Sequence, residues 1–252
     1  MGPVGIEFEW ERDAKGYRKA EEAPSPNNAL RILIGAPQIR FPENLPMPQS
    51  TGPEDALYVV RNGGTLIRYR ADEDLDQIFR EFVNTPPSAD GAVAFANRWG
   101  QLVGPDDDGA EPVRLTTQAV KAMNLFIDAW PENEETNQAG LERALGADGL
   151  EIGNLKARLI FDRRTDAPRM QFAMPNLVTA LWMHLTKILT SDTVMRRCLH
   201  CHMIFTAGVG TDRRLDAKFC SDEHRLTFHR LKNTELTPHQ PRRRGRPRRI
   251  AA

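Results

Sequence analysis

The chain has 252 residues, of which 40% are hydrophobic and 27% charged, so it can bury a core without disulfide cross-links. No stretch approaches the roughly 18 consecutive apolar residues of a membrane-spanning helix, and the first residues lack the basic start and apolar segment of a secretory signal. The composition therefore argues against a membrane partner and a secreted disulfide framework, and we expect a cytoplasmic protein.

The formal net charge is zero, yet the two signs are unevenly distributed. Residues 196–252 contain 14 Lys and Arg against 5 Asp and Glu, a charge of +9, which leaves −9 on residues 1–195. Clustered Arg and Lys attract polyanions even in a neutral molecule, so the pattern predicts a nucleic-acid partner, with DNA first and RNA as the alternative. It also raises the hypothesis that the acidic body contacts the basic tail within one chain.

The acidic part of the chain divides into two segments. Residues 1–53 are rich in proline, and short strands are expected at 5–10 and 30–34. Residues 54–195 mix helical and β patterns and are expected to form an α+β domain of unknown role, with helices and β-hairpins. The spacing of apolar residues predicts helices at 72–83, 88–102, 116–130, 136–146 and 175–192.

Two turns predict β-hairpins in this domain. Asn62-Gly63 separates the β-favouring runs 57–60 and 65–70, and both residues of this dipeptide tolerate positive φ. The second turn lies at residues 163–168, and strands are expected on either side of it at 154–162 and 169–174.

All three cysteines lie in the basic end and form a metal-ligand pattern with a histidine. Cys198, Cys201, Cys220 and His224 have the spacing C-x2-C-x18-C-x3-H. Two ligands on a tight knuckle and two on one helical turn can meet at a tetrahedral centre, which is the arrangement of a structural Zn²⁺ site. An odd number of cysteines argues against a disulfide framework and favours a metal site in a reducing compartment.

The same segment allows other chemistries. Cys198, Cys201 and His202 match the attachment motif of c-type haem, but haem attachment needs export and leaves the later cysteine and histidine without a role. A redox pair needs its C-x-x-C at the start of a helix that follows a strand, whereas Cys198 is expected to follow the end of a helix. Within the zinc interpretation, His200 or His202 can take the place of His224.

The segment after Cys220 is expected to be a helix with two distinct faces. Ser221 is expected to accept hydrogen bonds from the first backbone N–H groups. One face carries the ligand followed by apolar contacts: His224, Phe228 and Leu231. The neighbouring face carries a basic stripe: Arg225, His229 and Lys232.

The C-x2-C, the aromatic residue after it, the basic loop and the string "FCSDEHR" together resemble treble-clef zinc fingers at the C-termini of many bacterial proteins. They are distantly similar to CGNR-type zinc-finger transcriptional regulators, in which a helical input domain precedes a C-terminal finger. The resemblance covers residues 196–232 and implies a treble-clef-like finger over 196–234. In such a finger the four ligands are Cys198, Cys201, Cys220 and His224. This chain has His224 where a cysteine is usual, and it has no C-G-N-R string.

Residues 235–252 end in "PRRRGRPRRIAA", which cannot form a packed core and is expected to be disordered when free. Arg244-Gly245-Arg246-Pro247 resembles an AT-hook, whose flat Gly-Arg-Pro core lies in the narrow minor groove of A·T-rich DNA. We therefore expect Arg244 and Arg246 to enter the minor groove. Further DNA contacts are expected from the finger: Arg213, Arg214, Arg225, His229, Arg230 and Lys232.

These features predict a zinc-finger DNA-binding protein whose purpose is transcriptional regulation, and not an enzyme. The alternative is a zinc-stabilised module that binds protein or RNA without recognising a DNA sequence. His-Asn-His nucleases also use treble-clef-like frames, but their catalytic histidine and asparagine are not evident around residues 213–218. Four protein ligands also leave no open coordination position for a reactive water.

Overall fold

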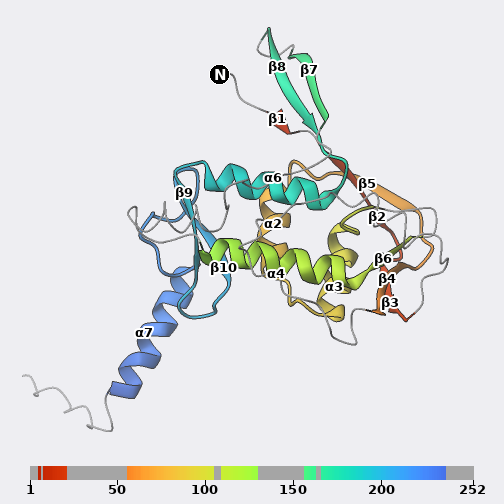
Figure 1. Cartoon of the computed structure of the whole chain (residues 1–252). Coiled ribbons are helices and arrows are strands. Elements are labelled where there is room, and N and C mark those ends of the chain that lie inside the picture. The colour runs from red at the N-terminus through yellow and green to blue at the C-terminus, as the bar shows by residue number, and fades with distance from the viewer. Residues whose placement is uncertain are drawn as a thin grey trace, which may run out of the picture.

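The computed structural model describes residues 5–6, 8–21, 56–104, 109–129, 156–162 and 166–236. Helices and small, mostly antiparallel sheets are mixed along the chain, which confirms the predicted α+β class (Figure 1). The strand predicted at 30–34, the helix predicted at 136–146 and the basic tail from residue 237 onward lie outside the described residues.

The body is built around helices that the apolar spacing predicts. The described helices before the finger are α2 (Leu75–Val83), α3 (Ala89–Trp99), α4 (Val113–Ala129) and α6 (Leu177–Leu189). Ser88 caps α3 by accepting a hydrogen bond from the Gly91 N–H, and Asn176 caps α6 by accepting one from the Thr179 N–H. No described helix combines the length and the apolar character that crossing a membrane requires.

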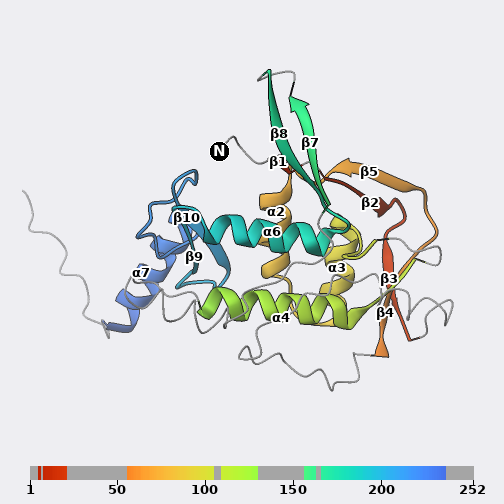
Figure 2. The same cartoon turned by 45° about the horizontal axis from the view of Figure 1, so that its top comes forward.

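The main core lies between these helices. In both views α6 and α4 run beside each other with α2 crossing between them (Figures 1 and 2). Trp182 of α6 is completely buried and meets Phe126 of α4 edge-on, with ring centroids 6.3 Å apart. Phe79 and Phe82 of α2 are completely buried in the same cluster. The apolar stripes of three helices thus converge on one core.

The prediction of a β-hairpin at Asn62-Gly63 is wrong. Its two strands exist as β4 (Tyr58–Arg61) and β5 (Leu66–Arg70), but they do not pair with each other. Instead β5 pairs with β2 (Glu9–Asp13) and β4 pairs with β3 (Tyr17–Ala20), both antiparallel. The N-terminal strands therefore occupy the positions that a local hairpin would have filled.

Asp13 accounts for the interruption between these strand pairs. Its carboxylate is buried and accepts hydrogen bonds from the backbone N–H groups of Lys15, at 2.7 Å, and Gly64, at 2.9 Å. Arg61 donates to it from Nε at 3.1 Å. Burial alone would raise the pKa of Asp13, but these donors hold it below its usual value. One buried carboxylate thus joins the turns of two segments that are distant in sequence.

A second buried carboxylate belongs to β6 (Ala110–Pro112), which pairs with β4. Glu111 is 2% exposed and accepts hydrogen bonds from the backbone N–H groups of Leu102, at 3.1 Å, and Val103, at 2.8 Å. Burial raises the pKa of Glu111 to about 7, although both hydrogen bonds act in the opposite direction. The fold therefore holds a carboxyl group that titrates near neutral pH.

Two further strand pairs project from the helical core. β7 (Lys156–Asp162) and β8 (Ala167–Ala173) form the predicted antiparallel hairpin, and β1 (Gly5–Ile6) adds to β8 in parallel. At another end of the body lie β9 (Thr193–Arg197) and β10 (Ile204–Gly208), from which α7 (Asp222–Leu236) leads away (Figure 1). Cys198 therefore follows a strand, and the expectation that it follows a helix end is wrong.

Candidate metal centre

The first two cysteines lie on the connection between β9 and β10. The backbone N–H of Cys198 donates to the Met203 carbonyl at 3.0 Å, and the N–H of His202 donates to the Cys198 carbonyl at 2.9 Å. His202 has a φ of 60°, a left-handed conformation that glycine adopts more readily. These bonds close a tight knuckle that turns Cys198 and Cys201 toward the same point.

The other two members of the group lie at the start of α7. Cys220 precedes the helix, and His224 follows within its first turn. The Ser221 hydroxyl accepts a hydrogen bond from the His224 N–H at 3.1 Å, which confirms the predicted capping role of Ser221. The cap fixes the first turn, so the positions of Cys220 and His224 relative to each other are set by helix geometry.

Cys198, Cys201, Cys220 and His224 come together as a group that could hold a metal ion, with all ligand atoms within 4.8 Å of one another. The Cys201 and Cys220 sulfur atoms are 3.7 Å apart, and His224 Nδ1 lies 3.9 Å from Cys198 Sγ and 3.0 Å from Cys220 Sγ. In a tetrahedral zinc site, sulfur atoms about 2.3 Å from the metal are about 3.8 Å apart. The four side chains thus have the spacing and the chemistry of a closed metal site.

The pKa values of Cys198 and Cys220 are shifted in opposite directions, and a bound cation would stabilise both as thiolates. Burial would raise the pKa of Cys198, but backbone N–H groups of the knuckle and of the α7 start lower it to about 6. Burial and the neighbouring sulfur atoms raise the pKa of Cys220 to about 12. Three sulfur atoms this close cannot all carry a negative charge without a cation between them, so metal binding would release protons here.

His200 and His202, the predicted alternatives to His224, lie outside the group of converging ligand atoms. His202 is exposed, and His200 lies beside His224, with ring centroids 5.0 Å apart. Neither is a member of the group of ligand atoms that converge. The chain after Cys201 continues into strand β10 rather than a helix, which differs from the arrangement that a thioredoxin-type redox pair requires.

The β9–β10 hairpin belongs to both the body and the finger, which in the structure extends from the start of β9 to the end of α7, slightly beyond the predicted bounds of 196–234. Met195 and Ile204 are buried in the main core. Cys198, Phe205 and Ala207 form a small separate cluster, against which Cys201, Ala217, Phe219 and Cys220 are partly buried. Because this second core is so small, the finger has little apolar burial of its own to stabilise it.

Two polar contacts fasten the hairpin to the body, and sequence analysis missed both. The side-chain amide of Asn84 donates to the Ile204 carbonyl at 3.0 Å and accepts from the Ile204 N–H at 2.7 Å. Arg197 donates to both carboxylate oxygens of Asp128, at 2.7 and 2.9 Å, and to Asn124 Oδ1 at 2.6 Å. The metal-ligand group is therefore held on the helical core at the ends of α2 and α4.

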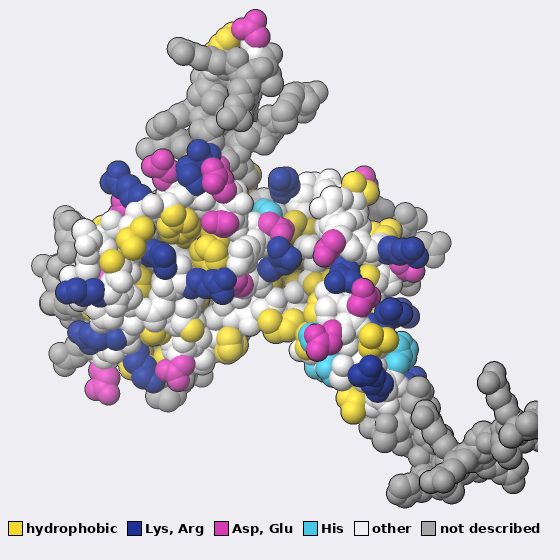
Figure 3. Space-filling view, turned by 180° about the vertical axis from the view of Figure 1, so that it is seen from behind, with side chains coloured by type: hydrophobic (Ala, Val, Ile, Leu, Met, Phe, Trp, Pro, Cys, Tyr) yellow, Lys and Arg dark blue, Asp and Glu magenta, His cyan; other side chains and the backbone are white. Residues whose placement is uncertain are grey.

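The predicted DNA-contacting residues that the structure describes all lie on the finger. Arg213 is half-buried, whereas the others are exposed: Arg214, Arg225, His229, Arg230 and Lys232. Figure 3 shows His side chains concentrated at this end of the molecule, with Lys and Arg side chains beside them and others spread over the rest of the face. Arg244 and Arg246 lie outside the described residues, so the AT-hook stays a prediction.

The apolar face predicted for α7 is only partly correct. Phe228 packs on Phe219, with ring centroids 5.3 Å apart. Leu231 is 56% exposed, so its predicted contact beneath the ligand is wrong. The reason is visible in Figures 1 and 2, where α7 leads away from the body and its later turns meet no other described element.

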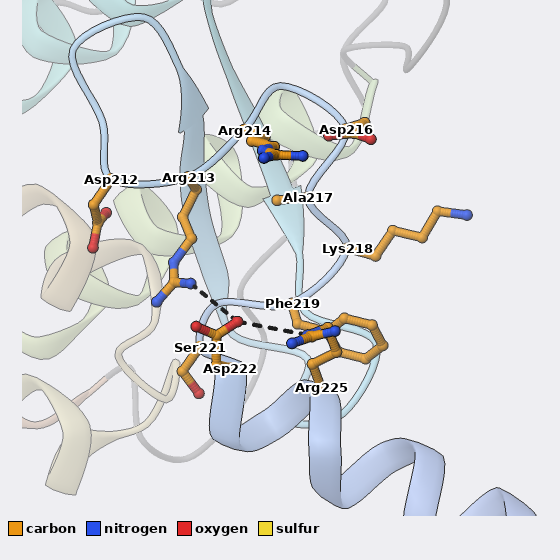
Figure 4. Close-up of a pocket in the computed structure, with 10 residues that line it drawn as sticks. All are labelled: Asp212, Arg213, Arg214, Asp216, Ala217, Lys218, Phe219, Ser221, Asp222 and Arg225. Atoms are coloured by element: carbon orange, nitrogen blue, oxygen red, sulfur yellow. Dashed lines mark ion pairs between the residues drawn. The ribbon is translucent and has the colours of Figure 1, made fainter.

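A cavity of about 610 Å³ opens beside the metal-ligand group, between the loop at 212–219 and the start of α7 (Figure 4). Arg213 and Arg225 point toward Asp222 from two sides, whereas Lys218 points away from them. The lining is polar and carries charges of both signs: Arg213, Arg214, Lys218 and Arg225 with Asp212, Asp216 and Asp222. Such a lining suits a charged ligand rather than an apolar one.

The structure thus presents a group of three cysteines and one histidine that could hold a metal ion, in an α+β protein. No family model, no curated protein and no solved structure matches the chain.

Proposed function

We propose that Cys198, Cys201, Cys220 and His224 bind one structural Zn²⁺. The observation that supports zinc is the donor set itself, because three thiolates and an imidazole at tetrahedral spacing suit this ion and exclude hard cations, which prefer oxygen. The ion supplies cohesion that the small apolar cluster around Phe205 lacks. With four protein ligands the coordination shell is closed, so the proposed role is structural rather than catalytic.

We further propose that the protein binds DNA through the finger and the tail and acts as a transcriptional regulator. The exposed cationic residues of the finger carry this proposal, and the arginine-rich C-terminus follows them in the sequence. Phosphate contacts of this kind give affinity and orientation, and the Gly-Arg-Pro segment of the tail would add a preference for narrow minor grooves.

The salt dependence of binding tests the proposal. If about six to eight cationic groups meet phosphates, log affinity should fall with log salt with a slope of about −5 to −7 on duplex DNA. Titrations of the full chain with A·T-rich, G·C-rich and single-stranded probes at several salt concentrations measure this slope. Deletion of residues 238–252 should reduce the slope and remove the A·T preference. Equal weak binding to all three probes, unchanged by the deletion, would contradict the proposal and favour a protein-binding module.

A further inference from the structure

The cavity beside the metal centre contains two arginines that converge on one carboxylate oxygen. Asp222 Oδ1 lies 3.8 Å from Arg213 Nη1 and 3.5 Å from Arg225 Nε (Figure 4). Arg213 comes from the loop after β10, and Arg225 comes from the first turn of α7. Two guanidinium groups from separate elements therefore share a single anionic partner at the mouth of a cavity.

This shared contact is loose. Both distances exceed the 2.7 to 2.9 Å of a charge-assisted hydrogen bond between a guanidinium and a carboxylate. The Asp222 side chain is 76% exposed, so solvent screens the attraction. Most N–H donors of the two arginines therefore remain available to another oxyanion. Binding such an ion would break only the weak contact with Asp222.

The loop that carries Arg213 is fixed before any ligand binds. The Arg213 carbonyl accepts from the Gly208 N–H at 2.9 Å, and the Thr211 hydroxyl accepts from the Arg213 N–H at 3.2 Å. Gly208 has a φ of 115°, and a Cβ there would lie 2.5 Å from the Asp192 carbonyl oxygen, so this turn requires glycine. A preorganised arginine loses less conformational entropy on binding than a free surface side chain.

We propose that Arg213 and Arg225 form a clamp for one backbone phosphate and that Asp222 is its internal competitor. This inference rests on the proposed DNA binding and adds that Asp222 regulates its affinity. A backbone phosphate offers two non-bridging oxygens to the two planar guanidinium groups and replaces the single Asp222 oxygen between them. Asp222 then faces the phosphate as a like charge, so it lowers the affinity of the clamp.

Substitution of Asp222 can show whether the affinity for DNA depends on its contact with the two arginines or only on the net charge of the finger. In the metal-loaded full chain, Asp222→Asn should tighten binding to a short duplex by about threefold to tenfold, the effect of removing weak exposed ion pairs and one repulsion. Glu223→Gln is the matched control, because it removes the same charge from the next residue of the same helix turn, which has no ion pair within the described ranges. It should change affinity by less than about twofold. Equal tightening by both variants would overturn the proposal.

A second measurement does not depend on DNA binding. Titration of the wild-type chain with inorganic phosphate should shift the Nε–H nuclear magnetic resonance signals of Arg213 and Arg225 and leave that of the exposed Arg230 unchanged. In Asp222→Asn the same shifts should occur at lower phosphate. Absence of any specific shift would overturn the clamp. Specific shifts without duplex binding would support the clamp and contradict the proposed DNA function, so the two failures are distinguishable.

Discussion

Removal of the metal is expected to unfold the finger and also to lower the stability of the helical body. A structural zinc site of this class contributes on the order of 10 kcal/mol to folding, and the cluster around Phe205 is too small to replace it. The effect should reach the body because Met195 and Ile204 of the same hairpin are buried in the main core. Asn84 and Arg197 bind that hairpin to α2 and α4.

Tryptophan fluorescence can report on the body alone, because all four tryptophans precede the finger in the sequence. A strong chelator should reduce the helical circular dichroism of α7 and shift the fluorescence-detected melting midpoint downward. Added Zn²⁺ should restore both signals. A fluorescence midpoint that stays constant while the helical signal falls would show that finger and body unfold independently, against the shared hairpin described above.

The second large effect concerns Glu111 and pH. Its pKa is raised from 4.5 to about 7 in the folded chain, so between these values the folded state holds a proton that the unfolded state has lost. The contribution to stability is therefore fully present below pH 4.5 and is lost as pH rises toward 7. Its size is about 1.4 kcal/mol for each pH unit in that window. We expect the wild-type free energy of unfolding to carry this downward slope.

Glu111→Gln should remove the slope, because the amide cannot titrate. It keeps one acceptor for the N–H groups of Leu102 and Val103 and loses the other, so the variant should be less stable than the wild type at pH 5 and more stable at pH 8. Denaturant unfolding at several pH values measures the difference. Glu73→Gln, at a side chain that is 68% exposed, is the control and should leave the slope intact. Parallel curves for the wild type and Glu111→Gln would refute this interpretation.

Local patterns located the described helices and one of the two predicted hairpins, but they missed the strands β3, β6, β9 and β10. Apolar spacing and caps such as Ser88 located the helices, because these signals act within one or two turns. Asn62-Gly63 was misleading because the competing strands come from the N-terminal segment, far away in sequence. Asp13 joins the two segments through side-chain contacts that leave no local signature.

The metal centre was predictable for a related reason. Cysteine and histidine spacing encodes which side chains can reach one point, so the convergence of these four side chains could be predicted from the chain. Its attachment to the body was not, since Asn84 meets Ile204 across 120 residues and Arg197 meets Asp128 across 69. The short strand β9 was also missed, and with it the continuity between the helical core and the knuckle.

The most direct test of the metal centre is the metal content of the purified chain by native mass spectrometry, for the wild type beside His224→Ala and His202→Gly. The wild type should carry one Zn²⁺ and His224→Ala should lose it. His202→Gly should keep the ion and fold at least as well, because glycine adopts the left-handed φ of 60° at this position without strain. A metal-free wild type, or an ion that survives His224→Ala and is lost in His202→Gly, would contradict the ligand set.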